Sequence, residues 1–255
     1  MKEWRPDRCG ASRNNGKGGI TMQLTERKLW NANHQRLTAL LQNPKGHEQA
    51  VELFLSQHAW LYVSKMADAG SANKLNTLED ELLDGIREET LRQYPVKAPD
   101  TKNSILWHLW HIARIEDMTM NVLIAGREQI FEEGDWLAKM GLACTHTGNG
   151  MTEEEAAELS AGIDIEALLG YRIEVGRRTR EIVRSMEPAD MKRKVPGAGI
   201  ERLRTQSAVK PEAEWLLEYW SKKTLAGLIL MPATRHNFLH LNKAIRIKQR
   251  LQKQG

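Results

Sequence analysis

Hydrophobic residues recur every three or four positions along most of the chain, which is the spacing of one face of an α-helix. The pattern is sustained in four long segments, at residues 47–69, 104–125, 163–186 and 224–250. A fifth segment, 24–42, predicts a further helix that ends where Asn43 and Pro44 interrupt the pattern. No stretch of the sequence alternates with the period of two that a half-buried strand requires. The sequence therefore predicts an all-α fold, a four-helix bundle with long connections and an extra N-terminal helix.

The segments between these helices are rich in proline, glycine and polar residues and are expected to be connections. They lie at residues 70–76, 94–103, 141–150 and 187–212. A capping box, a threonine followed three residues later by an acidic residue, predicts one short helix at Thr77–Asp80 and another at Thr152–Glu155. Residues 1–21 are rich in Gly, Asn, Arg and Lys and are expected to form a flexible leader, which leaves 22–255 as a single domain.

The segment 104–125 is the most hydrophobic of the predicted helices, and its apolar residues fall on two faces. One stripe contains Trp107, His111, Ile115, Met118 and Val122. The other contains Leu106, Leu109, Ala113, Met120 and Ile124. A helix that is apolar on two faces is buried on both. We therefore expect one stripe to face its own bundle and the other to meet a second subunit in a homodimer.

The charge pattern narrows the choice of macromolecular partners. The 255-residue chain has a formal net charge of +4. Several basic residues gather near its end: Lys243, Arg246, Lys248, Arg250 and Lys253. We interpret them as a solvated helix end, where cations are placed favourably for the helix dipole. No basic patch with interleaved aromatic residues accompanies them, so the sequence disfavours nucleic acid as a partner.

Cysteine usage and hydropathy indicate the compartment. Cys9 and Cys144 stand in no CxxC pattern, which favours a reducing, cytoplasmic location. The longest apolar stretch, residues 225–233, is interrupted by glycine and proline and is far shorter than the roughly 20 residues that span a bilayer. We therefore expect no membrane partner.

The eight histidines include two pairs at helical spacing. His108 and His111 are three residues apart, and His236 and His240 are four apart. Side chains at positions i and i+4 of a helix lie one above the other, about 5–6 Å apart at Cβ, so two imidazoles there can share one cation. The second pair also lies on an apolar stripe and should point inward, where its ring nitrogens need partners.

The residues alone leave two interpretations of these histidines open. They could be core residues that are hydrogen-bonded to carbonyls or carboxylates. Alternatively, His111 on the most buried helix could join His236 and His240 in one metal site. Three histidine ligands leave a coordination position for water or substrate, which is the pattern of catalytic zinc sites.

Several motifs, taken in their order, resemble the DinB-like superfamily, a group of helical-bundle proteins that includes damage-inducible proteins and thiol-dependent S-transferases. Residues 103–117, NSILWHLWHIARIED, are similar to the histidine-bearing helix of that superfamily. Shorter motifs similar to one branch of it lie at residues 54–59, 134–138, 148–152 and 171–180. The resemblance covers residues 47–250.

This resemblance implies a four-helix bundle, commonly dimeric, with one metal-binding histidine on its second helix and two on its fourth. Carried onto this sequence, the metal ligands are His111, His236 and His240. His108, about 60° around the helix from His111, is the competing first ligand. We prefer His111 because it lies on the apolar stripe.

Two further residues are pocket candidates. His58 either contacts the substrate, supports a metal ligand from behind, or is a core histidine with a local hydrogen bond. Glu116 lies just over one turn past His111, and it either orients a ligand or caps a neighbouring helix.

The expected cofactor is a divalent metal, with Zn²⁺ or Ni²⁺ matching imidazole ligands best. By resemblance, the protein is expected to be an enzyme that transfers a low-molecular-weight thiol to an electrophile or carries out a related hydrolysis. A bound metal would activate the thiol or water by lowering its pKa. The alternative is a non-catalytic, stress-linked helical dimer, a binding or scaffold protein whose histidines are structural.

Overall fold

The computed structural model of the protein describes residues 16–66 and 77–253, with side chains from residue 25 onward. The described residues are helical and contain no strand, only the isolated bridges Ala98–Thr101 and Lys194–Thr224. The prediction of an all-α fold is confirmed. The α-helices are α1 (Gly16–Gln42), α2 (His47–Ala59), α3 (Leu78–Leu83), α4 (Glu88–Arg92), α5 (Ile105–Asp117), α6 (Ile130–Glu133), α7 (Trp136–Lys139), α8 (Glu153–Gly162), α9 (Ile165–Ser185), α10 (Gly197–Thr205), α11 (Trp215–Ser221), α12 (Leu225–Leu230) and α13 (Asn237–Gln252).

Two π-helical segments continue the longer helices. The segment η3 (Met118–Ile124) extends α5, and η6 (Met231–His236) joins α12 to α13. Four short 3₁₀ turns complete the chain: η1 (Pro44–Gly46), η2 (Ser64–Met66), η4 (Asp190–Lys192) and η5 (Pro211–Ala213). The last long segment of the sequence is therefore one helical rod with a widened turn where Pro232 lies.

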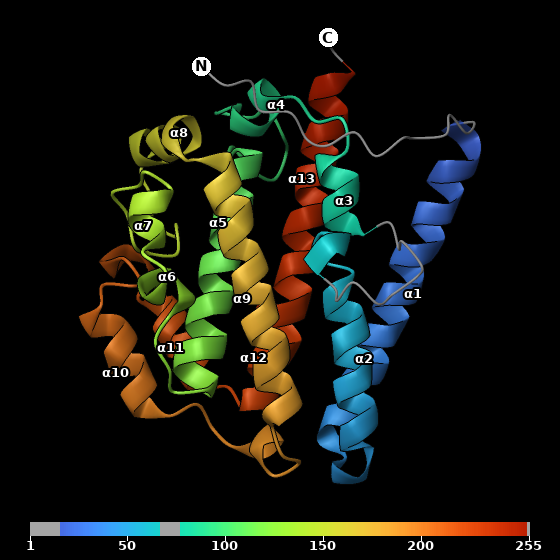
Figure 1. Cartoon of the computed structure of the whole chain (residues 1–255), viewed down its shortest axis with the longest axis vertical. Coiled ribbons are helices and arrows are strands. Elements are labelled where there is room, and N and C mark those ends of the chain that lie inside the picture. Colours follow the sequence, from blue (N-terminus) through green and yellow to red (C-terminus); the bar gives the residue numbers. More distant parts are fainter. Residues whose placement is uncertain (1–15, 67–76, 254–255) are drawn as a thin grey trace.

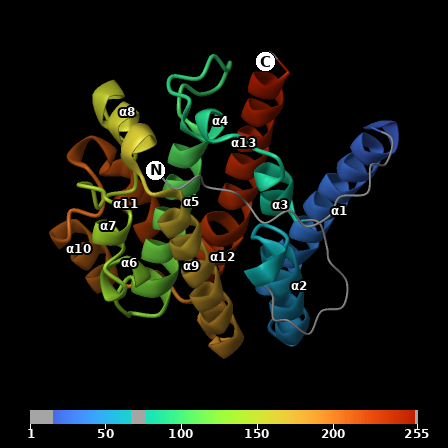
Figure 2. The same ribbon diagram turned by 45° about the horizontal axis from the view of Figure 1, so that its top comes forward.

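The longer helices pack side by side around α5. Helix α9 contacts both α2 and α5, α5 contacts α13, and α2 contacts η6, so these elements close a ring. In Figures 1 and 2, α9 runs alongside α5, and α1 lies outward along α2. Helix α1 begins within the segment predicted as a leader. Residues 1–15 lie outside the described residues, so the leader stays a prediction.

Helix α5 is the centre of the core, and all its residues are buried. Ser104 begins it, because the Ser104 hydroxyl accepts a hydrogen bond from the backbone N–H of Trp107 at 3.0 Å. Gly126, with φ +64°, follows the end of η3, as the sequence predicts. The capping boxes expected at Thr77–Asp80 and Thr152–Glu155 are both present.

The second predicted helix is shorter than expected. It ends at Ala59 rather than Ala69, and shortly beyond it two backbone N–H groups bond to acidic side chains of α3 instead of continuing the helix. Val63 donates to Glu79 Oε2 at 2.9 Å, and Ser64 donates to both carboxylate oxygens of Asp80 at 3.2 Å. Residues 67–69 of the expected helix lie outside the described residues.

The segment 187–212 is not mostly loop, as the sequence analysis expected. It contains α10, whose Ile200 and Leu203 are buried against η3. Gly199 lets α10 approach closely, since a Cβ there would lie 3.1 Å from a methyl carbon of Leu123. Apolar residues three positions apart indicate this helix. The glycines and the proline of the segment led instead to the prediction of a loop.

The second apolar stripe of α5 is buried within a single chain. Leu106, Leu109, Ala113 and Met120 are almost completely inaccessible, and α5 contacts α4, α6 and α8 besides α9 and α13. This corrects the reason given for a homodimer, because the stripe needs no second subunit to cover it.

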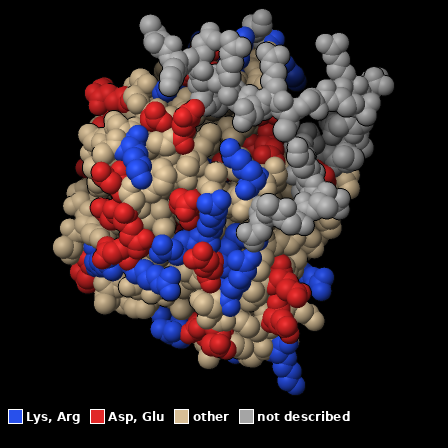
Figure 3. All heavy atoms as spheres, viewed as in Figure 1, with Lys and Arg blue, Asp and Glu red and all other residues tan. Residues whose placement is uncertain are grey.

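The basic end of α13 is bonded within the chain. Lys243 and Arg246 each lie 3.3 Å from a carboxylate oxygen of Asp100, and Lys248 donates to the carbonyls of Glu81 and Asp84. On the face drawn in Figure 3, basic and acidic side chains are interspersed. Among the described residues, no helix combines the length and apolar character needed to cross a membrane.

Candidate metal centre

Three helical elements bring four histidines together. Helix α5 supplies His108 and His111, η6 ends with His236, and α13 carries His240. The π-helical turn exists because Pro232 has no N–H to donate. Side chains bond two carbonyls at this turn: Thr234 Oγ1 donates to Leu230 O at 2.9 Å, and Asn237 Nδ2 donates to Pro232 O at 3.1 Å. This turn fixes the position of His236 at the start of α13.

His111, His236 and His240 converge on one point. Each offers a ring nitrogen, and these three nitrogens lie within 4.8 Å of one another. Two nitrogens bound to one zinc ion at about 2.0–2.1 Å can be no more than about 4.2 Å apart, so only a small side-chain movement separates this arrangement from coordination. His111 is buried, whereas His236 and His240 are partly accessible to solvent.

The remaining ring nitrogens show whether the site suits a metal. His111 Nδ1 donates to the carbonyl oxygen of Thr147 at 2.7 Å, which leaves its Nε2 with a free lone pair. His240 Nδ1 lies 3.0 Å from His108 Nδ1, so one of the two ring nitrogens of His240 is engaged by another imidazole. His236 Nδ1 is buried and has no hydrogen-bond partner. An unpartnered buried nitrogen among three converging imidazoles fits a metal ion.

Burial keeps these histidines in the form that binds metal. It lowers the pKa of His111 to about 4, against the opposing effect of the hydrogen bond to Thr147. It lowers the pKa of His108 to about 3, with the nearby His111 adding to the effect. The pKa values of His236 and His240 are also lowered, first by burial and then by the neighbouring imidazoles. All four rings are therefore neutral at pH 7, as metal ligation requires.

A buried arginine holds the loop that supports His111. Arg114 Nη2 donates to Thr145 O at 2.6 Å and to Gln129 Oε1 at 2.8 Å, and its Nη1 donates to Tyr171 Oη at 2.9 Å. Its guanidinium also stacks 3.9 Å above the ring of Phe131. Because the Thr145 and Thr147 carbonyls are both bound by α5, the 141–150 connection is fixed against the histidines.

Trp107 forms the wall between the histidines and a surface hollow. Its ring stacks on His111 with centroids 4.6 Å apart and an interplanar angle of 15°. On its other side, Trp107 lines a hollow of about 320 Å³ bounded by Tyr94, Lys102 and the residues 148–153. Gly148 allows this close approach, since a Cβ there would lie 3.2 Å from Trp107 Nε1. Trp107 therefore contacts both the histidine cluster and this hollow.

His58 and Glu116, the two pocket candidates, are fully buried and bonded to each other. His58 Nε2 lies 2.8 Å from Glu116 Oε1, while Tyr62 Oη and Asn237 Nδ2 donate to Glu116 Oε2 at 2.7 and 2.6 Å. Burial by itself would raise the pKa of Glu116, but His58 and these hydrogen bonds lower it. Glu116 therefore bonds to side chains of α2 and α13 and does not cap a helix. One of these side chains belongs to Asn237, which directly follows His236 in the sequence.

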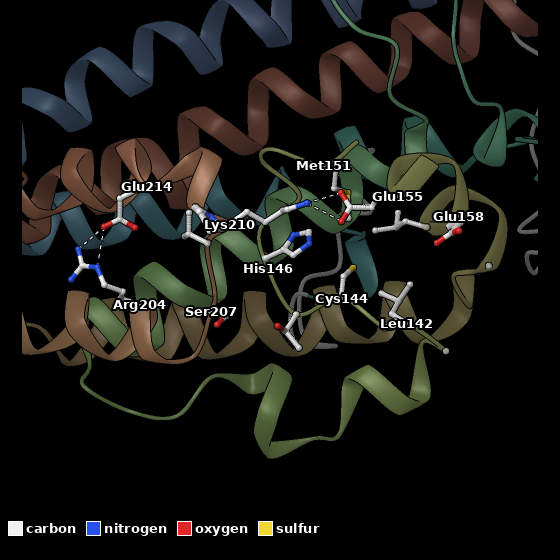
Figure 4. A pocket seen from close by; sticks show the side chains of 17 residues that line it. Leu142, Cys144, His146, Met151, Glu155, Glu158, Arg204, Ser207, Lys210 and Glu214 are labelled. Atoms are coloured by element: carbon white, nitrogen blue, oxygen red, sulfur yellow. Dashed lines mark hydrogen bonds and ion pairs between the residues drawn. The ribbon is translucent and has the colours of Figure 1, made fainter. Parts of the chain in front are cut away.

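A larger cleft was missed by the sequence analysis. It has a volume of about 780 Å³ and lies between the 141–150 connection, α8 and the segment 204–214 (Figure 4). Lys210 donates to both oxygens of Glu155 beside it, at 2.8 and 2.7 Å. Cys144 lines the cleft, but burial raises the pKa of its thiol to about 11. The protonated thiol is therefore a poor nucleophile at neutral pH.

Comparison with known protein families agrees with the all-α fold. The DinB superfamily matches residues 76–242, a range that includes all four histidines of the cluster. The chain therefore belongs to the DinB superfamily. No functionally curated protein matches it in sequence.

Proposed function

We propose that the protein is a metal-dependent enzyme that acts on a small molecule at His111, His236 and His240. The observation that carries this proposal is the convergence of three neutral imidazoles, within 4.8 Å, at a place that solvent reaches. Zn²⁺ or Ni²⁺ is the proposed cofactor, because imidazole nitrogens suit both ions. When bound, such an ion lowers the pKa of water or of a thiol at its open position and supplies a nucleophile at neutral pH.

The chain's own residues position and shield the site. The Thr147 carbonyl fixes the orientation of His111, and Arg114 fixes the loop that carries Thr147 through the neighbouring Thr145. Trp107 excludes water from one face of His111. The hollow beyond Trp107 has the volume of a small substrate, and its lining includes the ion pair of Lys102 with Glu153.

The proposed reaction is the transfer of a low-molecular-weight thiol to an electrophile, or a related hydrolysis. Cys144 is a poor source of this thiol, because burial raises the pKa of its own thiol to about 11, so the proposed nucleophile comes from a small molecule. A cytoplasmic homodimer is part of the proposal, as cysteine usage and the resemblance imply.

A non-catalytic helical dimer is the second candidate. The network around Glu116 favours it, because these buried polar groups bond to one another. Such a protein would have its remaining histidines bonded within a closed core. The partly accessible His236 and His240, with no partner for His236 Nδ1, favour the enzyme instead.

The decisive test is metal content, measured by elemental analysis on protein purified without chelator. We expect close to one equivalent of Zn or Ni in the wild type and none in the variant His236→Ala/His240→Ala. The control is His47→Ala, because His47 binds the Met186 carbonyl away from the cluster. A wild type that takes up neither ion on dialysis would contradict the metal centre.

Activity is tested next, by screening thiols against electrophiles with the metal-loaded protein. His236→Ala should abolish turnover while keeping its helical circular dichroism. Unchanged turnover in that variant would exclude this mechanism and favour the scaffold.

A further inference from the structure

His108 and His240 make an unusual contact for two neutral rings. Their Nδ1 atoms lie 3.0 Å apart, which is a hydrogen-bond distance. A neutral imidazole carries one N–H, so one ring must donate and the other must accept. The two possibilities differ in which nitrogen of His240 keeps a lone pair.

If His240 donates, its proton lies on Nδ1 and its Nε2 lone pair is free. If His240 accepts, its proton lies on Nε2, and neither nitrogen can then bind a metal without losing a bond. His111 already has the first arrangement, because a carbonyl can only accept and His111 Nδ1 must donate to it. Metal-binding histidines generally donate their other ring N–H in this way.

The surroundings of His108 allow it to accept. Its proton then lies on Nε2, which faces Thr101 Oγ1 at 3.4 Å. That oxygen serves as an acceptor elsewhere, since the backbone N–H of Asn103 donates to it at 3.0 Å. A chain of donors therefore runs from His240 through His108 to Thr101. His108 is also almost fully buried, so no solvent competes for its Nδ1.

We propose that His108 is a positioning residue, which accepts the Nδ1 proton of His240 and so holds the tautomer and ring orientation that present Nε2 to a metal. The inference rests on the proposed metal centre and deepens it. It also resolves the competition between His108 and His111: His111 is the ligand, and His108 supports a ligand from behind. The Thr147 carbonyl orients the ring of His111, and the imidazole of His108 orients the ring of His240 in the same way.

The first test compares Zn²⁺ affinity, measured by competition with a chelating indicator. His108→Leu removes the acceptor and should weaken Zn²⁺ binding by about 10–100-fold, the usual effect of losing such a support. His108→Asn should restore most of the affinity, because its amide oxygen lies where Nδ1 was. His47→Leu is the matched control and should bind like the wild type.

The second test needs neither a variant nor a metal. Long-range ¹H–¹⁵N correlation spectra of the metal-free wild type should show His240 protonated at Nδ1 and His108 at Nε2. A His240 ring protonated at Nε2 would overturn the inference, even if His108→Leu fails to fold.

The outcomes also separate this inference from the proposed function. A wild type that binds Zn²⁺ while His108→Leu binds it equally well would overturn the role of His108 and leave the metal centre standing. A wild type that binds no Zn²⁺ would overturn both.

Discussion

Helix α5 carries two buried polar clusters less than two turns apart, and they differ in how completely their atoms are bonded. Near its C-terminal end, Asp117 accepts from Asn121, from Tyr171 and from the backbone N–H groups of Ile130 and Phe131, at 2.7–2.9 Å. Arg114 lies 3.5 Å from the same carboxylate. Nearer the N-terminal end of α5, the histidine cluster leaves the buried Nδ1 of His236 without a partner.

The difference separates structure from function on one helix. Apart from the unpartnered Oδ1 of Asn121, the Asp117 cluster is bonded within itself and has no access to solvent. It therefore has little to offer a ligand, and its role is to hold α6 and the 141–150 connection onto α5. An unsaturated cluster is costly to bury unless something else completes it. This difference can be tested by breaking the first cluster, by completing the second with a metal or protonating it with acid, and by a substitution in the loop beside Trp107.

The largest effect is expected from breaking the closed cluster. Asp117→Ala leaves Arg114 without its carboxylate in the core and orphans the N–H groups that begin α6. Removing one partner of a buried ion pair costs about 3–5 kcal/mol, so the free energy of unfolding in urea should fall by this amount. Glu174→Ala breaks an exposed ion pair with Arg177 and should change stability little. Equal losses in the free energy of unfolding would show that the buried ion pair contributes no more to stability than the exposed one.

Completing the open cluster should give the next largest effect. Zn²⁺ at 100 times its dissociation constant stabilises the folded state by about 2.7 kcal/mol. For a chain of this size that raises the Tm by about 5–10 °C in a thermal scan. His240→Ala should show no rise at the same concentration. A rise of equal size in that variant would mean that Zn²⁺ binds elsewhere.

Acid should destabilise the metal-free protein through the open cluster. The pKa values of His111, about 4, and His108, about 3, lie below the ordinary value of 6.5. Between these values the unfolded chain binds more protons, so stability falls as the pH drops from 6.5 towards 4 and is unaffected by these groups above 6.5. Urea unfolding at pH 7.5 and pH 5 measures the loss, which should be smaller in His111→Gln. An identical loss of stability in both proteins would show that the histidines do not cause it.

The open cluster was the more predictable of the two. The i, i+4 spacing of His236 and His240 and the place of His111 on an apolar stripe are local features of the sequence, and the structure brings all three together. The closed cluster was not predicted, because Asp117 finds Tyr171 and the start of α6 only through tertiary packing. Sequence spacing does not indicate which residues meet across helices.

The fold likewise contains elements that local sequence predicts and elements that depend on tertiary contacts. Helix α5 and its continuation η3, with Ser104 at the start and Gly126 after the end, could be predicted from their own residues. The end of α2 at Ala59 could not, since side chains of α3 determine it. The widened turn η6 was predictable in part: Pro232 indicated a kink, but not that Thr234 and Asn237 would bond the carbonyls of Leu230 and Pro232.

The smallest effect is expected at the glycine where the connection touches the wall of the open cluster. Gly148 and Gly126 both have positive φ, 85° and 64°. Alanine in this region costs about 1–2 kcal/mol at either position, because of its Cβ. At Gly126 the new methyl group would meet nothing within 4 Å, whereas at Gly148 it would press on Trp107 at 3.2 Å. Gly126→Ala therefore isolates the backbone effect.

Gly148→Ala should lose slightly more stability than Gly126→Ala in urea unfolding, and only Gly148→Ala should weaken Zn²⁺ binding, by a few-fold. The reason is that a displaced Trp107 shifts its stacking partner His111, and the adjacent Thr147 carbonyl moves with the loop. Unaltered Zn²⁺ affinity in Gly148→Ala would show that the centre tolerates movement of its wall. In that case the hydrogen bonds to the two Nδ1 atoms, rather than the packing around them, hold the ligands in place.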